Sequence, residues 1–153
     1  MTSRLSQCLG INIGKLFATA AESDDSSNVI LVDDRKIFIS GALPIPEEVF
    51  PSATITGFTR PTEVTEYAKA NRIVLAFLDI EMGKMNGLNL CRTLLELNPC
   101  TNVVFFTAHM EYSFEVWHTG ACGFLLKPIT AENVRLQLKN LRYPLNFGVN
   151  AND

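Results

Sequence analysis

The sequence has 153 residues, of which 47% are hydrophobic and 19% are charged. This length suffices for one domain with a substantial core and is short for two domains. The net charge of −3 and the lack of a basic run argue against a nucleic-acid-binding surface. No apolar stretch approaches the length of a transmembrane helix. We therefore expect one domain that binds neither nucleic acid nor membrane.

The cysteines give an expectation about compartment. There are four of them, Cys8, Cys91, Cys100 and Cys122, and none forms a Cys-x-x-Cys pair. With only two histidines in the chain, this spacing argues against a zinc site. We expect four reduced, partly buried thiols in a cytoplasmic protein.

The two ends of the chain differ from its middle. Residues 1–28 lack a convincing hydrophobic signal-peptide core and end in a polar, Ser- and Asp-rich stretch from Glu22 to Asn28. We predict a poorly ordered extension over 1–28, a folded domain over 29–144 and a short tail over 145–153.

Five short apolar or β-branched runs predict five strands. They cover residues 29–32, 53–58, 73–78, 102–107 and 123–126. Continuous apolar runs of this length are typical of strands that are buried on both faces, as in a parallel sheet.

Helical patterns separate these strands. We expect helices over residues 61–71, 88–98, 111–119 and 130–143, the third with Phe114 and Trp117 turned toward the core and the last with Leu136, Leu138 and Leu141 as its apolar residues. Pro61 suits a first helical turn, Gly120 a C-terminal cap and Thr130 an N-cap. The first connection is interrupted by Gly41, Pro44 and Pro46, so we expect a short or broken helix near Lys36–Leu43.

Alternating strands and helices define the fold class. Five such alternations predict an α/β, flavodoxin-like (βα)5 three-layer sandwich with a parallel sheet of order 2-1-3-4-5. The carboxyl ends of all five strands then lie at one edge of the sheet, where open α/β sheets bind their ligands.

Polar residues follow the predicted strands at that edge. They are Asp33 and Asp34 after the first strand, Asp79 after the third, Thr107 at the end of the fourth and Lys127 after the fifth. Three carboxylates in one crevice repel one another unless a cation joins them, and an all-oxygen ligand set suits magnesium. A lysine and a hydroxyl nearby suit an anion, and a carboxylate can accept a phosphoryl group. The residues alone therefore predict a magnesium-dependent aspartyl-phosphate site.

From about Val29 to Tyr143, the chain resembles the receiver domain of two-component response regulators. The residues that carry the resemblance are Asp33, Asp34, Asp79, Met82, Met85, Gly87, Thr107, Ala108, Phe124, Lys127 and Pro128. The segments 107–115 and 120–128 most resemble receivers that precede LytTR-type DNA-binding domains.

The resemblance implies specific roles. Asp79 would take a phosphoryl group from a sensor histidine kinase or a phosphotransfer protein. Asp34, Asp79 and the backbone carbonyl of Glu81 would hold Mg²⁺ directly, and Asp33 would do so through water. Lys127 and the Thr107 hydroxyl would bind phosphate oxygens, Ala108 would leave access, and Phe124 would change rotamer as Thr107 moves. Glu81 and His109 stand where the family tunes hydrolysis of the acyl phosphate.

The switch would act on the face formed by the fourth helix, fifth strand and fifth helix, which is also a candidate homodimer interface. Its target would be a downstream protein or an effector domain. The sequence leaves open whether the chain acts alone by docking or is one part of a longer regulator.

Some residues depart from the family pattern. Gly83 stands where proline is usual, and Arg35 replaces a common acid beside the metal pair. These departures keep a pseudo-receiver, which binds partners without phosphorylation, as the alternative. A hydrolase of the haloacid dehalogenase type would need aspartate where Glu81 stands, and it fits less well.

Overall fold

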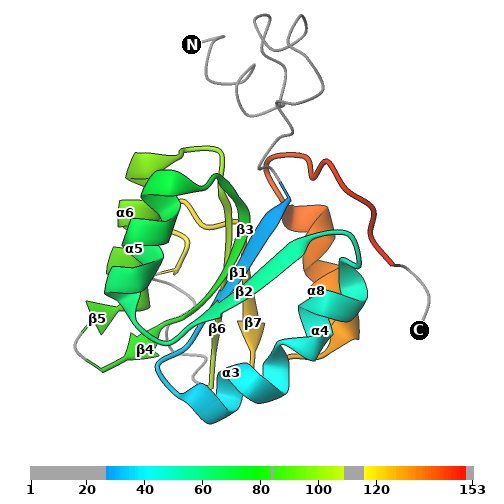
Figure 1. Cartoon of the computed structure of the whole chain (residues 1–153), viewed down its shortest axis with the longest axis horizontal. Coiled ribbons are helices and arrows are strands. Elements are labelled where there is room, and N and C mark those ends of the chain that lie inside the picture. Colours follow the sequence, from blue (N-terminus) through cyan, green and yellow to red (C-terminus); the bar gives the residue numbers. More distant parts are fainter. Residues whose placement is uncertain (1–26, 84, 109–115, 151–153) are drawn as a thin grey trace, which may run out of the picture.

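A five-stranded parallel sheet forms the centre of the computed structural model, which describes residues 27–83, 85–108 and 116–150. Its order is β2-β1-β3-β6-β7 (Figure 1). The strands are β1 (Asn28–Val32), β2 (Thr54–Phe58), β3 (Ile73–Asp79), β6 (Asn102–Thr107) and β7 (Gly123–Leu126). In sequence order of the five strands this is 2-1-3-4-5, so the predicted topology is confirmed. Every residue of β1, β3 and β6 is buried, which explains their uninterrupted apolar character.

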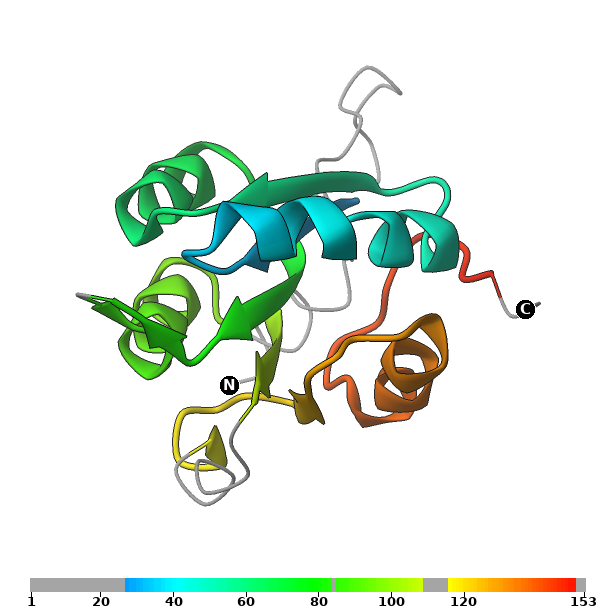
Figure 2. The same cartoon turned by 90° about the horizontal axis from the view of Figure 1, so that it is seen from below.

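Helices cover both faces of this sheet. The two helices α5 (Pro61–Ala70) and α6 (Gly87–Leu97) pack on one face. The other face is covered by α3 (Lys36–Ala42), α4 (Pro44–Val49) and α8 (Ala131–Gln137) (Figure 2). Each layer encloses its own apolar cluster against the sheet. The three-layer sandwich expected from the sequence is thus confirmed, and none of the helices in the described part of the chain is both long and apolar enough to cross a bilayer.

The first connection contains two short helices. The predicted helix near Lys36–Leu43 is present as α3, and a second helix that was not predicted, α4, follows at Pro44. Pro44 and Pro46 sit in the first turn of α4, where their missing N–H groups cost no helical hydrogen bond. The prolines therefore divide this crossover and do not abolish its helical character.

The last helix is shorter than predicted. It covers Ala131–Gln137 and continues as a 3-10 turn over Leu138–Asn140, where a helix to residue 143 was expected. The Thr130 cap is confirmed, because its hydroxyl accepts the N–H of Asn133 at 3.0 Å. After this turn, the backbone N–H groups of Arg142 and Tyr143 donate to the side chain of Asn102 on β6.

Two expectations about apolar side chains were wrong. Trp117, predicted to face the core, is 56% exposed, and its neighbour Val116 is the buried residue. Leu136, predicted on the apolar stripe of the last helix, is 51% exposed. Most of the helix expected over 111–119, with Phe114, lies outside the described residues. Gly120 has φ of +92°, which agrees with its predicted role as a cap.

The cysteines are not all reduced. Cys91 and Cys122 are buried free thiols, as expected. Cys100 is disulfide-bonded, so the prediction of four reduced thiols is wrong at this position. Cys8 and the rest of the predicted N-terminal extension up to residue 26 lie outside the described residues.

Candidate functional site

Strand register brings the predicted polar residues together. Val32 of β1 pairs with Leu78 of β3, so Asp33 and Asp79 follow neighbouring strand positions. Asp79 pairs with Phe106 of β6, which places Thr107 one residue beyond it. Thr107 in turn pairs with Leu126 of β7, directly before Lys127. Four adjacent strands therefore deliver these side chains to one edge of the sheet.

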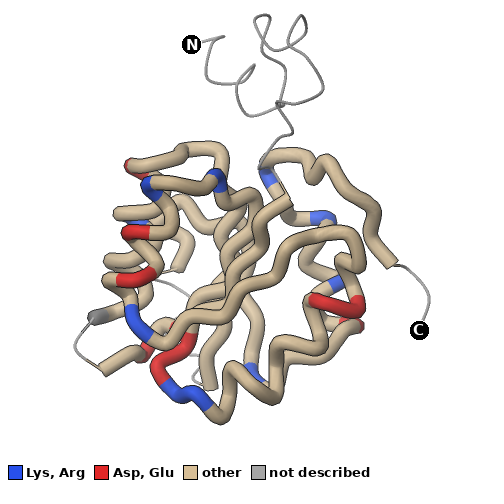
Figure 3. The backbone as a smooth tube through the Cα atoms, in the orientation of Figure 1, with Lys and Arg blue, Asp and Glu red and all other residues tan. Residues whose placement is uncertain are grey.

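Three carboxylates form a cluster at this edge. One oxygen from each of Asp33, Asp34 and Asp79 lies within 4.8 Å of the others. Asp33 and Asp79 are 0% and 3% exposed, whereas Asp34 is exposed at the start of the loop to α3. The acidic stretch that ends β1, with a basic stretch directly after it, is visible at the lower end of the sheet in Figure 3.

Lys127 is the cation that faces this cluster. Its ammonium group lies 2.8 Å from an oxygen of Asp33 and 3.5 Å from an oxygen of Asp79. It also lies over the ring of Phe38, at 4.3 Å from the centroid. Phe38 was not predicted as a site residue; its only sequence signal is its position four residues after Asp34, in the first turn of α3.

Asp33 already has partners on both oxygens. Its Oδ1 accepts the backbone N–H of Arg35 at 2.8 Å, and its Oδ2 accepts the ammonium of Lys127 at 2.8 Å. The Arg35 guanidinium lies 3.6 Å from Oδ1, but this side chain is 60% exposed, so the ion pair contributes little. These contacts give both oxygens of a fully buried carboxylate a hydrogen-bond donor, which offsets part of the cost of its burial.

Asp79 is less well compensated. Burial, and second to it the nearby carboxylate of Asp33, raise the pKa of Asp79 from its usual 3.8 to about 6. Lys127 and a hydrogen bond from the Glu81 backbone oppose this shift without cancelling it. Negative charge at Asp79 is therefore destabilised, and a further cation in the crevice would stabilise it.

A small hairpin that was not predicted shapes the loop after Asp79. The strands β4 (Glu81–Met82) and β5 (Met85–Asn86) pair in antiparallel fashion, and Gly83 lies between them with φ of +53°. Proline cannot adopt this conformation, because its ring holds φ near −65°. Gly87 then packs so closely on the Asp79 carbonyl that a side chain would clash. The hairpin fixes Glu81 at the rim of the site.

A cavity of about 310 Å³ opens at this edge. Its lining residues are Asp34, Arg35, Asp79, Glu81, Thr107, Ala108 and Lys127. The structure therefore brings together almost all of the predicted site residues. Phe124 lies apart from them, half-buried on β7 against the cluster under α5 and α6. His109 lies outside the described residues.

The donor set fits a hard divalent cation. Three carboxylates with closely spaced oxygens offer only oxygen ligands, and no histidine or thiolate takes part among the described residues. The partly uncompensated charge on Asp79 points the same way. The cluster is thus consistent with the magnesium site expected from the sequence.

Comparison with known proteins decides the family. The family model described as the response regulator receiver domain matches residues 29–139. The chain belongs to the response regulator receiver family. An uncharacterised response regulatory protein of Vibrio cholerae is 28% identical to it over 121 residues, which cover 78% of this chain and 46% of that protein. Sensory transduction protein LytT of Bacillus subtilis is 28% identical over 68 residues, covering 44% of this chain and 28% of that protein.

Solved receiver structures share the fold. A response regulator protein from Burkholderia pseudomallei, crystallised with a phosphorylated aspartic acid, a calcium ion and citrate, superposes with a TM-score of 0.65 at 21% identity. The match covers 75% of this chain and 66% of that one. The chain is therefore a receiver domain of two-component systems, a signalling domain, and it spans less than half the length of either sequence relative.

Proposed function

We propose that this receiver accepts a phosphoryl group on Asp79 in a magnesium-dependent reaction, and that a sensor histidine kinase or a phosphotransfer protein donates it. The observation that carries the proposal is the cluster of Asp33, Asp34 and Asp79 beside Lys127 in one cavity. Asp79 would be the acceptor because, of the two buried carboxylates, it is the one that lines the cavity, and its charge is incompletely compensated.

Asp34, Asp79 and the Glu81 carbonyl would hold Mg²⁺ directly, and Asp33 would do so through water. When bound, the ion neutralises charge that develops on the transferred phosphoryl group. An oxygen of Asp79 attacks phosphorus, the bond from phosphorus to the donor nitrogen breaks, and its electron pair stays on the donor imidazole. The product is a mixed anhydride on Asp79, which the domain itself hydrolyses slowly, so it is not a turnover enzyme.

Lys127 and Thr107 would hold the new phosphoryl oxygens. The ammonium of Lys127 is within 3.5 Å of Asp79, and Thr107 lines the same cavity with the small Ala108. Movement of Thr107 would let Phe124 change rotamer and alter the face formed by residues 116–120, β7 and α8. Glu81 and His109 are the residues that we expect to tune hydrolysis.

The output of the switch is a downstream protein or an effector domain. The relatives are more than twice as long as their matched segments, which favours an effector domain. We propose a receiver unit over residues 29–144, with an extension over 1–28 and a tail over 145–153. We also propose a cytoplasmic location, where histidine kinases phosphorylate their partners, and a homodimer through the same switching face.

A pseudo-receiver is the second candidate. The observation in its favour is that Arg35 and Lys127 satisfy both oxygens of Asp33 without any metal. In that case the site would be a permanent ion-pair network, and the protein would bind its partners unphosphorylated.

Intact-mass spectrometry separates the two candidates. The protein is incubated with acetyl phosphate, with Mg²⁺ or with EDTA. We expect a gain of one phosphoryl group that requires Mg²⁺ and is absent in Asp79→Asn. No gain with any small phosphodonor would favour the pseudo-receiver.

A further inference from the structure

Two aromatic rings, those of Phe38 and Phe106, form a wall beside the ammonium group of Lys127. The ammonium lies 4.3 Å from the ring centroid of Phe38 and 5.4 Å from that of Phe106. The two rings stack with centroids 5.3 Å apart and an interplanar angle of 19°. Since the Lys127 side chain is only 12% exposed, its charge is held between acids and rings with little access to water.

The two kinds of neighbour bind the ammonium in different ways. A carboxylate accepts its N–H groups, whereas a ring face attracts the positive charge electrostatically and leaves N–H groups available for other acceptors. Under the proposed function, Asp79 would hold the metal directly and Asp33 through water, so both carboxylates would have a partner other than the ammonium. The ring contact does not depend on those carboxylates, so it remains when they are engaged.

We infer that Phe38 is a positioning residue, which holds the Lys127 ammonium over its ring so that the N–H groups face the phosphoryl group arriving at Asp79. This inference rests on the proposed function, because the group that Lys127 would bind is the transferred phosphoryl group. Phe38 does not touch the reacting atoms; it acts through Lys127.

Phe38 is better placed for this role than Phe106. Its centroid is nearer to the ammonium, and it is half-buried on the short helix α3, whereas Phe106 is fully buried within β6. Phe38 also borders a second cavity with Ile37, Gly41 and Ile45, which gives room for one added hydroxyl group.

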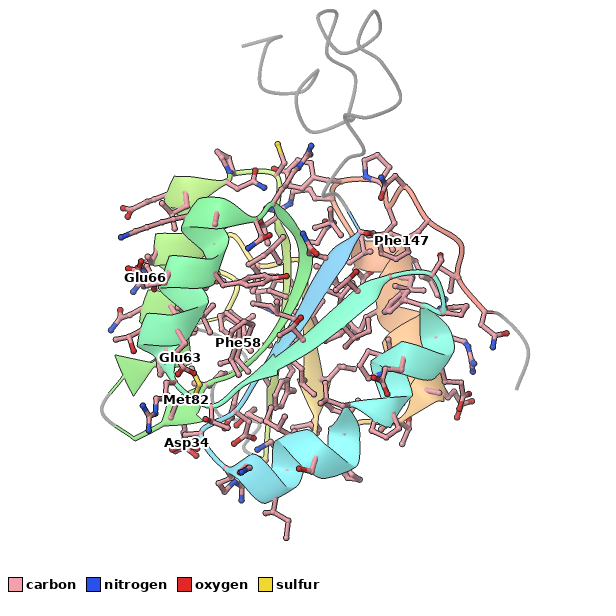
Figure 4. The ribbon with its side chains drawn as sticks, in the orientation of Figure 1. Asp34, Phe58, Glu63, Glu66, Met82 and Phe147 are labelled. Atoms are coloured by element: carbon pink, nitrogen blue, oxygen red, sulfur yellow. The ribbon has the colours of Figure 1, made fainter. Side chains whose placement is uncertain are left out.

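The test compares three variants of the full chain. Phe38→Leu removes the ring, Phe38→Tyr keeps it, and Phe147→Leu removes an equally half-buried ring from the same apolar layer. Phe147 packs on Phe50 and lies toward the opposite end of the sheet from Asp34 (Figure 4). With acetyl phosphate and saturating Mg²⁺, we expect Phe38→Leu to lower the maximal phosphorylation rate about 3- to 30-fold, which spans the range from an exposed to a desolvated cation–π contact. Phe38→Tyr and Phe147→Leu should stay near the wild-type rate.

A second readout does not depend on phosphorylation. In metal-free protein, the ring faces should shift the NMR signals of the Lys127 ε-methylene protons upfield. We expect this shift to shrink in Phe38→Leu and to persist in Phe38→Tyr and Phe147→Leu. An unchanged shift in Phe38→Leu, or equal rates in Phe38→Leu and Phe147→Leu, would overturn the inference. If the wild type took up no phosphoryl group while the shift behaved as expected, the proposed function would fail and the ring contact would stand.

Discussion

The two ends of the sheet both bury polar residues, and they do so in different ways. At the amino end, Asn102 is 1% exposed and donates to the carbonyl oxygens of Val74 and Tyr143, both at 3.0 Å. Its side-chain oxygen accepts the backbone N–H groups of Arg142 and Tyr143. At the carboxyl end, the carboxylates of Asp33 and Asp79 are buried, and the mostly covered ammonium of Lys127 contacts both of them.

This difference separates a structural polar group from a reactive one. The amino end uses a neutral amide whose hydrogen bonds go mostly to backbone, so it is complete without any ligand. The carboxyl end gathers three acids around one lysine, so its negative charge exceeds its positive charge until a cation enters. Buried polar residues therefore do not by themselves distinguish the two ends of the sheet. The carboxyl end differs because its buried charge is incompletely compensated.

The largest effect is expected from removing the lysine at the carboxyl end. Lys127→Met leaves Asp33 buried without its cation, which should lower the free energy of unfolding by about 3 kcal/mol in EDTA. Mg²⁺ should restore much of this loss, because it supplies the missing positive charge. Urea denaturation with and without Mg²⁺ measures both effects. The control is Lys69→Met, whose exposed pair with Glu66 should contribute little; equal losses in the two variants would contradict the account.

A substitution at the amino end of the sheet should lower stability in a way that Mg²⁺ does not reverse. Asn102→Ala leaves several buried backbone groups unpaired, and we expect a loss of about 2–3 kcal/mol that Mg²⁺ does not restore preferentially. The phosphorylation rate with acetyl phosphate should stay near that of the wild type. Asn89→Ala, on the exposed face of α6, serves as the control. A Mg²⁺-dependent rescue of Asn102→Ala would show that the two ends are not independent.

Asp79 should make stability depend on pH. Because its pKa is raised to about 6 in the folded protein, this group favours folding below about pH 4, and that contribution is lost as the pH rises through 6. In EDTA at pH 7.5, Asp79→Asn should therefore be more stable than the wild type by about 1–3 kcal/mol. The gain should vanish near pH 4. Thermal melts across this range test it, with the exposed Glu63→Gln as a control that should show no such trend.

A smaller effect is expected from Arg35. Its guanidinium competes weakly with a metal for Asp33, so Arg35→Glu should tighten Mg²⁺ binding by about 2- to 5-fold. Lys36→Glu makes the same charge change one residue farther along and should change the affinity less. Titration of Mg²⁺ by calorimetry measures both, and a larger effect from Lys36→Glu would contradict this assignment.

The strands, and the edge of the sheet that holds the site, could be predicted from the sequence because both depend on short-range patterns. The apolar runs that end in Asp33, Asp34 and Asp79 predict both the strands and the site residues that follow them. The exposure of Trp117, the early end of α8 at Gln137 and the contacts of Asn102 were not predictable in this way. They depend on which distant segment packs against each residue. For example, the backbone N–H groups of Arg142 and Tyr143 donate to the side chain of Asn102 and not to helical carbonyls. The aromatic wall beside Lys127 was missed for the same reason, since Phe38 and Phe106 meet only in three dimensions.

Chemical mapping of the phosphoryl group tests directly which carboxylate accepts it. Borohydride reduces an aspartyl phosphate to homoserine, which peptide mass spectrometry can place in the sequence after treatment with acetyl phosphate and Mg²⁺. We expect homoserine at position 79 and at neither 33 nor 34, with none formed in EDTA. Homoserine at position 33 or 34, or at position 79 to the same extent in EDTA, would contradict this expectation.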